Sequence, residues 1–298
     1  MIAPLVSVVT ITYNHEPWIA RTIEGVLAQQ VDFPLEMVIA EDCSTDGTRA
    51  VCERYAEAHP DIIRLLPSER NLGIIPNERR AMAAARGMYI AFCEGDDYWT
   101  EPSKLQSQVD FLESHPDYSV CFTRCRHFNE RTQEWSDDLC EPLFANGEEG
   151  VDVDVDLFFR QWVTQPLTMV YRADAIGLDL YDRYKYYRDQ HQIYHLLCAG
   201  KGYLFNFVSG VRVMHDGGLA SLISTAEYCD ISIPMDGEFY RKTRAKGAKE
   251  TYLTTLQTAV GAYTPGRRFK ALRCAFEHLL ISGKIKRFVK NVVKIARG

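Results

Sequence analysis

The chain has 298 residues, of which 46% are apolar and 25% charged, and its net charge is −6. Residues 1–5 lack the basic region and cleavage site of a signal peptide, and no apolar run approaches the ~20 residues of a membrane-spanning helix, so we expect a cytoplasmic globular protein. Nine cysteines occur without a Cys-x-x-Cys pair, which excludes a zinc ribbon or disulfide framework and predicts reduced, mostly buried thiols.

The charge is unevenly distributed along the chain. Residues 264–298 carry ten Lys or Arg side chains against one acid, Glu277, which gives this segment a net charge of +9. The other 263 residues carry 24 basic and 39 acidic side chains, a net charge of −15. This contrast predicts that the C-terminal segment has a negatively charged partner of its own.

The first hundred residues alternate between apolar runs and amphipathic segments. The apolar runs predict strands at residues 5–13, 35–40, 62–66 and 87–93. Apolar side chains at helical spacing predict helices between them, at 18–27, up to 55, and at 77–86. Because alternating strands and helices form parallel sheets with right-handed crossovers, we expect an α/β fold with a Rossmann-like, doubly wound, mainly parallel sheet.

Beyond residue 100 the pattern loosens. Helices are predicted at residues 104–113, 157–159 and 186–197, and strands at 118–123, 168–172, 203–208 and 211–215. A polar loop is predicted at residues 127–150. From residue 228 the chain is predicted to be helical, with interruptions at Pro234, Gly247, 264–266 and Gly283. We therefore expect one α/β domain at residues 1–225 and a helical extension at 226–298.

Three acids, Glu94, Asp96 and Asp97, follow the fourth predicted strand directly. In open α/β sheets this edge borders the crevice where ligands bind. Crowded carboxylates repel one another, and an all-oxygen cluster suits Mg²⁺ or Mn²⁺, which keep positions open for phosphate oxygens. We therefore predict a metal-phosphate site here. The alternative is a solvated loop that caps the helix beginning near residue 100.

Polar residues also end the first and second predicted strands, at Tyr13 to Glu16 and at Glu41-Asp42. We expect these segments to meet the three acids at one sheet edge. Carboxylates can bind ribose hydroxyls and an aromatic ring can stack on a base, so the combination suits a nucleotide diphosphate with a metal. The alternative for Glu41-Asp42 is helix capping. The sequence contains neither a P-loop nor a Gly-x-Gly-x-x-Gly motif, which argues against a P-loop NTPase and a dinucleotide oxidoreductase.

Four motifs within about one hundred residues resemble the family 2 glycosyltransferases, which have the GT-A fold. They are Val6 to Asn14, Glu41-Asp42-x-Ser44-Thr45-Asp46-Gly47-Thr48, Asn71-x-Gly73, and Gly87-x-Tyr89-Ile90-Ala91-Phe92-x-Glu94-Gly95-Asp96-Asp97. Two later segments, Arg188-Asp189 and Arg212 to Gly218, extend the resemblance to about residue 225.

The resemblance implies a role for individual residues. It places Thr10 and Tyr13 along the uridine, Glu16 near the ribose, Asp42 at the uracil ring, Asp96 at the ribose or metal, Asp97 and His215 at the metal, and Asp189 as the catalytic base. The family's common form has aspartate where this chain has Glu94 and a charged residue where it has Cys43, so the resemblance assigns Glu94 no role. From its position alone, Asp189 has the alternative of capping the helix that follows it.

The resemblance implies an inverting transferase that depends on Mn²⁺ or Mg²⁺. It would move a sugar from a nucleotide diphosphate donor, a UDP-sugar, to a glycan or lipid-linked acceptor in bacterial surface polysaccharide synthesis. Residues 1–100 would bind the donor and residues 101–225 the acceptor. The alternatives are a hydrolase or nucleotidyltransferase using the same crevice, and a catalytically silent module that binds nucleotide sugars.

Two weaker patterns remain. His191 and His195 have the spacing of a zinc pair on a helix, but the Glu of His-Glu-x-x-His is absent and we do not predict a zinc site. Residues 284–296 form a basic amphipathic segment that suits an anionic membrane surface, here the inner face of the plasma membrane. Its alternatives are a helix packed on the core or a contact in an oligomer. We expect no nucleic-acid partner.

Overall fold

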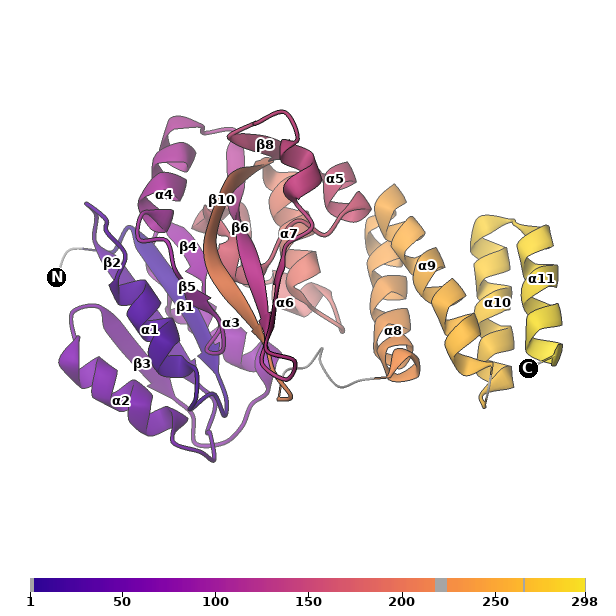
Figure 1. Cartoon of the computed structure of the whole chain (residues 1–298), viewed down its shortest axis with the longest axis horizontal. Helices are drawn as coiled ribbons and strands as arrows, with labels where there is room; N and C mark the ends of the chain where they lie inside the picture. Colours follow the sequence, from indigo (N-terminus) through magenta and orange to yellow (C-terminus); the bar gives the residue numbers. More distant parts are fainter. Residues whose placement is uncertain (1–2, 218–223, 265, 298) are drawn as a thin grey trace. The chain divides into compact units, whose positions relative to one another are not determined.

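The computed structural model describes residues 3–217, 224–264 and 266–297. Contacts divide the chain into two compact units, the first made of residues 1–183 with 188–215 and the second of 184–187 with 216–298. The first unit is α/β and the second is helical (Figure 1). Gly218, the last residue of the segment that begins at Arg212, lies outside the described residues.

The first half of the α/β unit is a parallel sheet with helical crossovers. Its strands are β1 (Val6–Thr12), β2 (Leu35–Glu41), β3 (Ile63–Pro67) and β4 (Tyr89–Phe92), in the spatial order β3-β2-β1-β4. The crossover helices are α1 (Ile19–Leu27), α2 (Thr48–Ala58) and α3 (Ile74–Ala84). Every residue of β1 is buried, as expected for a central strand covered on both faces. The predicted doubly wound, mainly parallel sheet is confirmed for this half.

The second half continues the same sheet with mixed strand directions. Its strands are β5 (Tyr98–Trp99), β6 (Tyr118–Asn129), β7 (Glu134–Asp137), β8 (Gly150–Val153), β9 (Val170–Arg172) and β10 (Lys201–Met214). The short β9 lies antiparallel between β4 and β6, and β10 runs parallel to β6. Strands β5 and β8 pair antiparallel with β10, and β7 pairs antiparallel with β6. The sheet therefore joins the ends of β1, β4 and β10 along one edge.

Two apolar layers cover the two faces of this sheet. One contains side chains of α1, α2 and α4 (Lys104–Ser114), and the other contains side chains of α3, α5 (Val155–Arg160) and α7 (Asp189–Ala199). Alternate residues of β1 supply both layers, with Val8 in the first and Val9 in the second. The remaining short elements are η1 (Glu141–Phe144), η2 (Pro166–Thr168), η3 (Ala173–Ala175) and α6 (Leu180–Arg183).

A buried polar network fixes the start of β4. The Ser7 hydroxyl donates to Glu36 at 2.6 Å and accepts from the backbone N–H of Gly87 at 2.8 Å. Glu36 also accepts the Arg86 backbone N–H at 2.8 Å and pairs with the Arg86 guanidinium at 2.6 Å. These contacts tie β1, β2 and the entry to β4 together, which sets the position of the acids that follow β4.

Three expectations from the sequence are wrong. The predicted loop at 127–150 contains the end of β6 and all of β7. Strand β7 is exposed at every residue and polar except for Trp135, so it lacks the apolar alternation that predicts a strand. The two strands predicted at 203–215 are one strand, β10, whose pairing with β6 shifts register between Leu204 and Gly210. Pro234 lies inside a continuous helix, where we predicted an interruption.

The second unit is built from the helices α8 (Thr225–Thr243), α9 (Lys246–Tyr263), α10 (Arg268–Ser282) and α11 (Ile285–Arg297). Its core contains Tyr252, Leu256 and Val260 of α9 with Cys274 of α10 and Ile295 of α11. Ser224 and Glu227 form a capping box at the start of α8. None of the helices in the described ranges has the length and apolar composition needed to cross a bilayer.

Candidate active site

The acids after β4 lie on a turn that is tied to three other elements. The Gly95 N–H donates to the Ile11 carbonyl of β1 at 3.0 Å. The Thr22 hydroxyl of α1 donates to the Asp97 carbonyl at 2.7 Å, and the Val213 N–H of β10 donates to the Asp97 carboxylate at 2.9 Å. The predicted meeting of strand ends at one sheet edge is therefore confirmed for β1 and β4, and β10 joins them.

Two overlapping groups of metal-ligating side chains meet on this turn. Glu94, Asp96 and Asp97 form one group, and His15, Asp96 and His215 form the other; within each group the candidate ligand atoms lie within 4.8 Å of one another. Asp96 belongs to both, and its Oδ2 lies 3.1 Å from His215 Nε2 and 4.0 Å from His15 Nε2. Asp96 thus lies with Asp97 in one group and with His215 in the other, and His15 joins the second group.

The acids are crowded and short of positive charge. Burial, together with the charges of Asp96 and Asp97, holds the pKa of Glu94 well above its usual range. Burial and Asp96 likewise raise the pKa of Asp97. Burial opposes ionisation of Asp96 too, but its contacts with His215 and His15 outweigh burial and lower its pKa. A divalent cation would supply the missing positive charge, so the donor set fits a metal ion.

The imidazole of His15 also fits this assignment. Burial lowers the pKa of His15 against the opposing charge of Asp96, which favours the neutral form that ligates metals. Its Nδ1 has no hydrogen-bond partner in the described part of the chain. The ring lies edge-on to His215, with centroids 5.9 Å apart, and Trp18 packs on His215 at 3.9 Å. His15 was missed as a site residue because only its place after the first strand marked it.

Gly95 leaves no room for a side chain beneath these ligands. A Cβ at this position would lie 2.6 Å from the Thr12 hydroxyl and 2.9 Å from His15 Nδ1. We expect Gly95→Ala to displace the turn, to destabilise the fold by about 1–3 kcal/mol and to weaken Mn²⁺ binding. Urea unfolding and calorimetric titration with Mn²⁺ measure these effects. Gly266→Ala is the matched control, because a Cβ there meets nothing within 4 Å; equal behaviour of the two variants would contradict the prediction.

Asp189 lies near the metal-ligating groups, since its charge contributes to the raised pKa of Glu94. It is the first residue of α7 and follows the N-cap residue Arg188, and its carboxylate accepts the Gln190 N–H at 2.8 Å. The predicted alternative, that Asp189 is the N-cap, is therefore not what this helix uses. Burial raises the pKa of Asp189 against the opposing effects of the Gln190 N–H and of Arg212.

A second acid accompanies Asp189. Glu78 of α3 accepts a hydrogen bond from the Tyr181 hydroxyl at 2.6 Å. Burial raises the pKa of Glu78 to about 7, with a further contribution from the charge of Asp189. No sequence pattern marked Glu78 as a site residue, because it lies inside an alanine-rich helix rather than at a strand end.

The other predicted donor-binding residues lie around the ends of β1 and β2. Thr10 is fully buried within β1, whereas Tyr13 is 40% exposed. The Glu16 carboxylate accepts the Gly47 N–H at the start of α2 at 2.8 Å. Asp42 is buried and accepts the N–H groups of Leu72 and Gly73 at 2.9 Å each. Their roles toward a nucleotide stay predictions.

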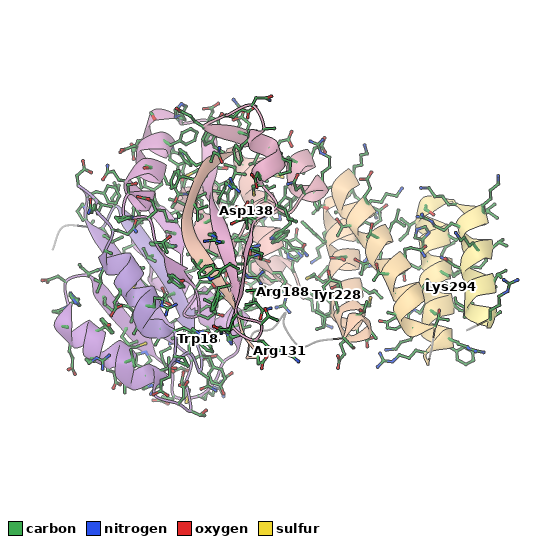
Figure 2. The ribbon with its side chains drawn as sticks, viewed as in Figure 1. Trp18, Arg131, Asp138, Arg188, Tyr228 and Lys294 are labelled. Atoms are coloured by element: carbon green, nitrogen blue, oxygen red, sulfur yellow. The ribbon has the colours of Figure 1, made fainter. Side chains whose placement is uncertain are left out.

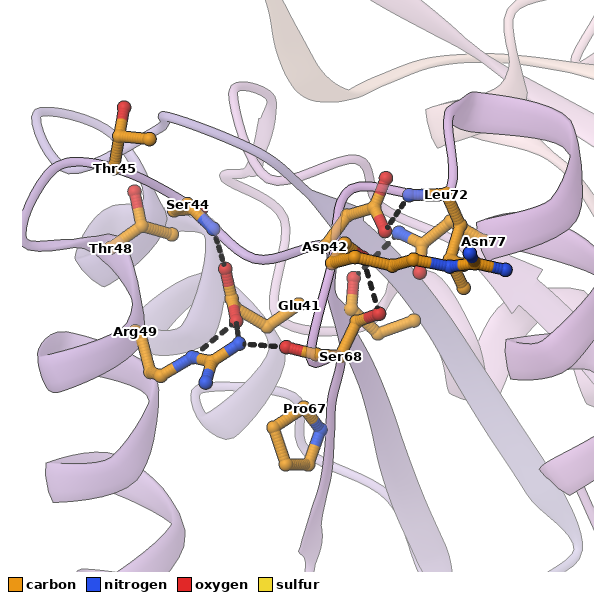
Figure 3. A network of polar contacts seen from close by, with 12 residues as sticks. Glu41, Asp42, Ser44, Thr45, Thr48, Arg49, Pro67, Ser68, Leu72 and Asn77 are labelled. Carbon is orange, nitrogen blue, oxygen red and sulfur yellow. Dashed lines mark hydrogen bonds and ion pairs between the residues drawn. The ribbon is translucent and has the colours of Figure 1, made fainter.

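Glu41 and Asp42 point in different directions (Figure 3). Glu41 is buried, pairs with Arg49 of α2 at 2.6 Å and accepts the Ser44 N–H at 2.6 Å. Asp42 instead holds the backbone that leads into α3. Neither acid caps a helix, because Glu41 accepts from Ser44 and Asp42 from Leu72 and Gly73, which all precede the first turns of α2 and α3.

The turn of the β6–β7 hairpin contacts residues that neighbour the metal-ligating side chains. Trp18 donates its indole N–H to Glu130 in the turn of this hairpin at 2.6 Å, and the Glu130 N–H donates to the Met214 carbonyl at 3.0 Å. Figure 2 shows Trp18 beside the turn that carries Arg131. On α7, His191 and His195 belong to no group of three or more metal-ligating side chains among the residues described.

Comparisons with known proteins fit this geometry. Residues 7–197 match the model of glycosyl transferase family 2. The chain belongs to glycosyltransferase family 2. The predicted family is confirmed.

Among the relatives of this family 2 chain is TuaG of Bacillus subtilis (strain 168), named for a glycosyltransferase of teichuronic acid biosynthesis. It is 39% identical over 109 residues, which are 37% of this chain and 42% of that protein. The chain spans about half the length of the curated relatives it matches.

Solved structures share the fold. A complex of S. aureus TarS 1–349 with UDP-GlcNAc matches with a TM-score of 0.64 at 17% identity, covering 93% of this chain and 81% of that one. The mannosyltransferase PcManGT of Pyrobaculum calidifontis, with GDP-Man and Mn²⁺, matches with a TM-score of 0.57 at 17% identity, covering 99% and 81%. The predicted GT-A fold class is confirmed.

Proposed function

We propose that this chain is an inverting, metal-dependent glycosyltransferase that moves a sugar from a nucleotide diphosphate to a hydroxyl group of a glycan or lipid-linked acceptor. The observation that carries the proposal is the position of Asp96 in two metal-ligating groups, on a turn where the charge of the buried Asp189 contributes to the raised pKa of Glu94. The acids on the turn suit a metal-bound diphosphate, and Asp189 suits an acceptor hydroxyl.

Asp96, Asp97 and His215, with His15, would hold Mn²⁺ or Mg²⁺. When bound, such an ion neutralises the negative charge that develops on the diphosphate leaving group. Imidazole nitrogens beside carboxylates favour Mn²⁺, since Mg²⁺ is bound mainly through oxygen. The neighbour PcManGT was solved with Mn²⁺. Glu94, which lies in one group with Asp96 and Asp97, would help to balance the charge of the ion.

The donor would lie along the ends of β1 and β2, within residues 1–100. Tyr13 is exposed at the end of β1, where its ring can stack on a base. Thr10, Glu16 and Asp42 would complete the nucleotide site. UDP is the proposed nucleotide, because the neighbour TarS was solved with UDP-GlcNAc.

Residues 101–225 would bind the acceptor. Asp189 would take the proton of the acceptor hydroxyl as its oxygen bonds to the anomeric carbon, while the bond to the diphosphate breaks on the opposite face. One such displacement inverts the anomeric configuration. The raised pKa of Asp189 brings it closer to that of a group able to accept a proton near neutral pH.

We place this reaction in surface polysaccharide synthesis at the inner face of the plasma membrane. The name of the relative TuaG supports the pathway class. A lipid-linked acceptor would be presented at the same membrane face. The helical extension predicted at residues 226–298 would not belong to the catalytic domain.

The test begins with thermal melting of the full chain with Mn²⁺ and a panel of nucleotide sugars. A donor at 100 times its dissociation constant adds about 2.7 kcal/mol to the stability, which identifies the nucleotide. The selected donor is then incubated with glycan and lipid-linked acceptors, and the anomeric configuration of the product is determined by NMR. Donor cleavage that does not need an acceptor would indicate a hydrolase instead, and binding without turnover a silent module.

A further inference from the structure

Helix α10 presents a row of large apolar side chains to water. Phe269, Leu272, Phe276 and Leu280 follow one another at spacings of three or four residues, so they lie along one side of the helix. Phe269 is 91% exposed, Leu280 is 69% exposed, and the other two are at least 37% exposed. The opposite side of α10, which includes Ala271 and Ala275, is buried in the core of the second unit.

Helix α11 continues this surface. Ile285, Val289 and Val293 lie four residues apart and are exposed, whereas Asn291 and Ile295 are buried. Helix α11 therefore has apolar side chains that pack on the rest of the second unit and further apolar side chains that are exposed to water. The two helices are side by side (Figure 1), and the rings of Phe276 and Phe288 meet with centroids 6.4 Å apart. This contact joins the two apolar rows.

Basic side chains surround both rows. The ten Lys and Arg residues of α10, α11 and their flanks are all exposed. Only Arg267 and Lys270 pair with an acid, Asp230, and among the described residues the other eight have no carboxylate partner. The single acid of the segment, Glu277, accepts the Tyr252 hydroxyl at 2.6 Å. Lys294, one of the cations of α11, is labelled in Figure 2.

We infer that these two apolar rows and their cations, the α10–α11 face, dock flat on an anionic lipid surface. A membrane interface supplies a negative potential for the cations and an apolar layer for the exposed side chains at once. Helices of 15 and 13 residues are too short to span a bilayer, which fits an orientation in its plane. The inference adds α10 to the membrane-binding segment predicted at residues 284–296, because α10 also exposes large apolar side chains.

A second copy of the chain fits this face less well. Two α10–α11 faces would bring two segments of charge +9 together, and the like charges would repel. An acidic soluble partner would satisfy the cations but not the apolar rows. The inference concerns lipid binding and does not depend on the proposed sugar transfer.

The test is co-sedimentation of the full chain with vesicles of phosphatidylcholine alone, or with about one third phosphatidylserine. We expect binding to the anionic vesicles, little binding to the neutral ones, and release by high salt. Absence of binding to the anionic vesicles at low salt would overturn the inference.

Two variants separate the apolar and charged contributions. Phe269→Ser with Leu280→Ser removes two exposed apolar side chains of α10, and we expect vesicle affinity to fall by about 100-fold. Lys286→Ser with Lys290→Ser should lower it by about fivefold per charge and reduce its salt dependence. Since all four side chains are exposed, circular dichroism melting should match that of the unchanged chain.

The matched controls lie in the first unit. Met88→Ser removes an apolar side chain that is 64% exposed, and Arg54→Ser with Arg131→Ser removes two exposed charges; both should leave binding unchanged. Equal loss in the controls and the α10 variant would refute the α10–α11 face. A dimer in sedimentation equilibrium that Phe269→Ser with Leu280→Ser dissolves would also refute it, because the face would then belong to an interface between copies.

Discussion

Asp189→Asn is expected to lower the rate of sugar transfer by about 10²- to 10⁴-fold, the span of general-base catalysis. Asparagine keeps the oxygen that accepts the Gln190 N–H but cannot take a proton at neutral pH. Because the base acts on the acceptor, the affinities for the donor and for Mn²⁺ should stay close to those of the wild-type protein. The measurements are kcat at saturating donor and acceptor, and calorimetry of nucleotide binding.

The pH dependence of the transfer rate is a second test of the role of Asp189. Since burial raises its pKa in the folded protein, the unchanged chain should lose activity as the pH falls through this raised value and keep it above. The asparagine variant should lack this acidic limb. Asp156→Asn, which removes an exposed acid from the first turn of α5, is the matched control and should stay within about twofold. Undiminished turnover in folded Asp189→Asn would show that Asp189 is structural.

Asp97→Asn is expected to abolish the Mn²⁺ dependence of nucleotide diphosphate binding. The substitution keeps the acceptor for the Val213 N–H at 2.9 Å but removes the negative charge that would hold the ion. We expect the affinity measured with Mn²⁺ to fall by about 100-fold or more, to the value found with a chelator. Calorimetric titration with UDP and GDP, with and without Mn²⁺, measures this loss.

Stability distinguishes a metal ligand from a structural acid at position 97. Burial and Asp96 disfavour the charged form of Asp97, so without metal the neutral asparagine should be at least as stable as the unchanged chain in urea unfolding. Asp110→Asn, an exposed change of the same kind on α4, should alter neither stability nor Mn²⁺ dependence. Unchanged Mn²⁺-dependent affinity in Asp97→Asn would remove Asp97 from the ligand set.

The parallel half of the fold could be predicted from sequence because its signals are local. Each residue of β1 except Ser7 is apolar or β-branched, and only Cys93 separates β4 from the acids, so their position at a sheet edge follows from the strand itself. The hairpin of β6 and β7 could not be predicted in this way. Its outer strand is fully exposed, and its polar residues resemble those of a loop.

The missing parts of the site depend on contacts between distant segments. His15 reaches Asp96 because Asn14, with a φ of 56°, reverses the chain after β1. Glu78 faces Asp189 because α3 and α7 cover the same side of the sheet. The spacing of residues within a segment does not indicate which distant segment it will contact. His215 was found only through the family resemblance, for the same reason.

The exposed cations of the α10–α11 face have a consequence for orientation. The negative potential that attracts this +9 segment repels the remaining 263 residues, which carry −15. Within a Debye length of about 8 Å the two effects exert a torque on a chain approaching the bilayer. In a docked chain the potential that holds the cations of this face on the lipid headgroups would therefore repel the acidic side chains of the other residues.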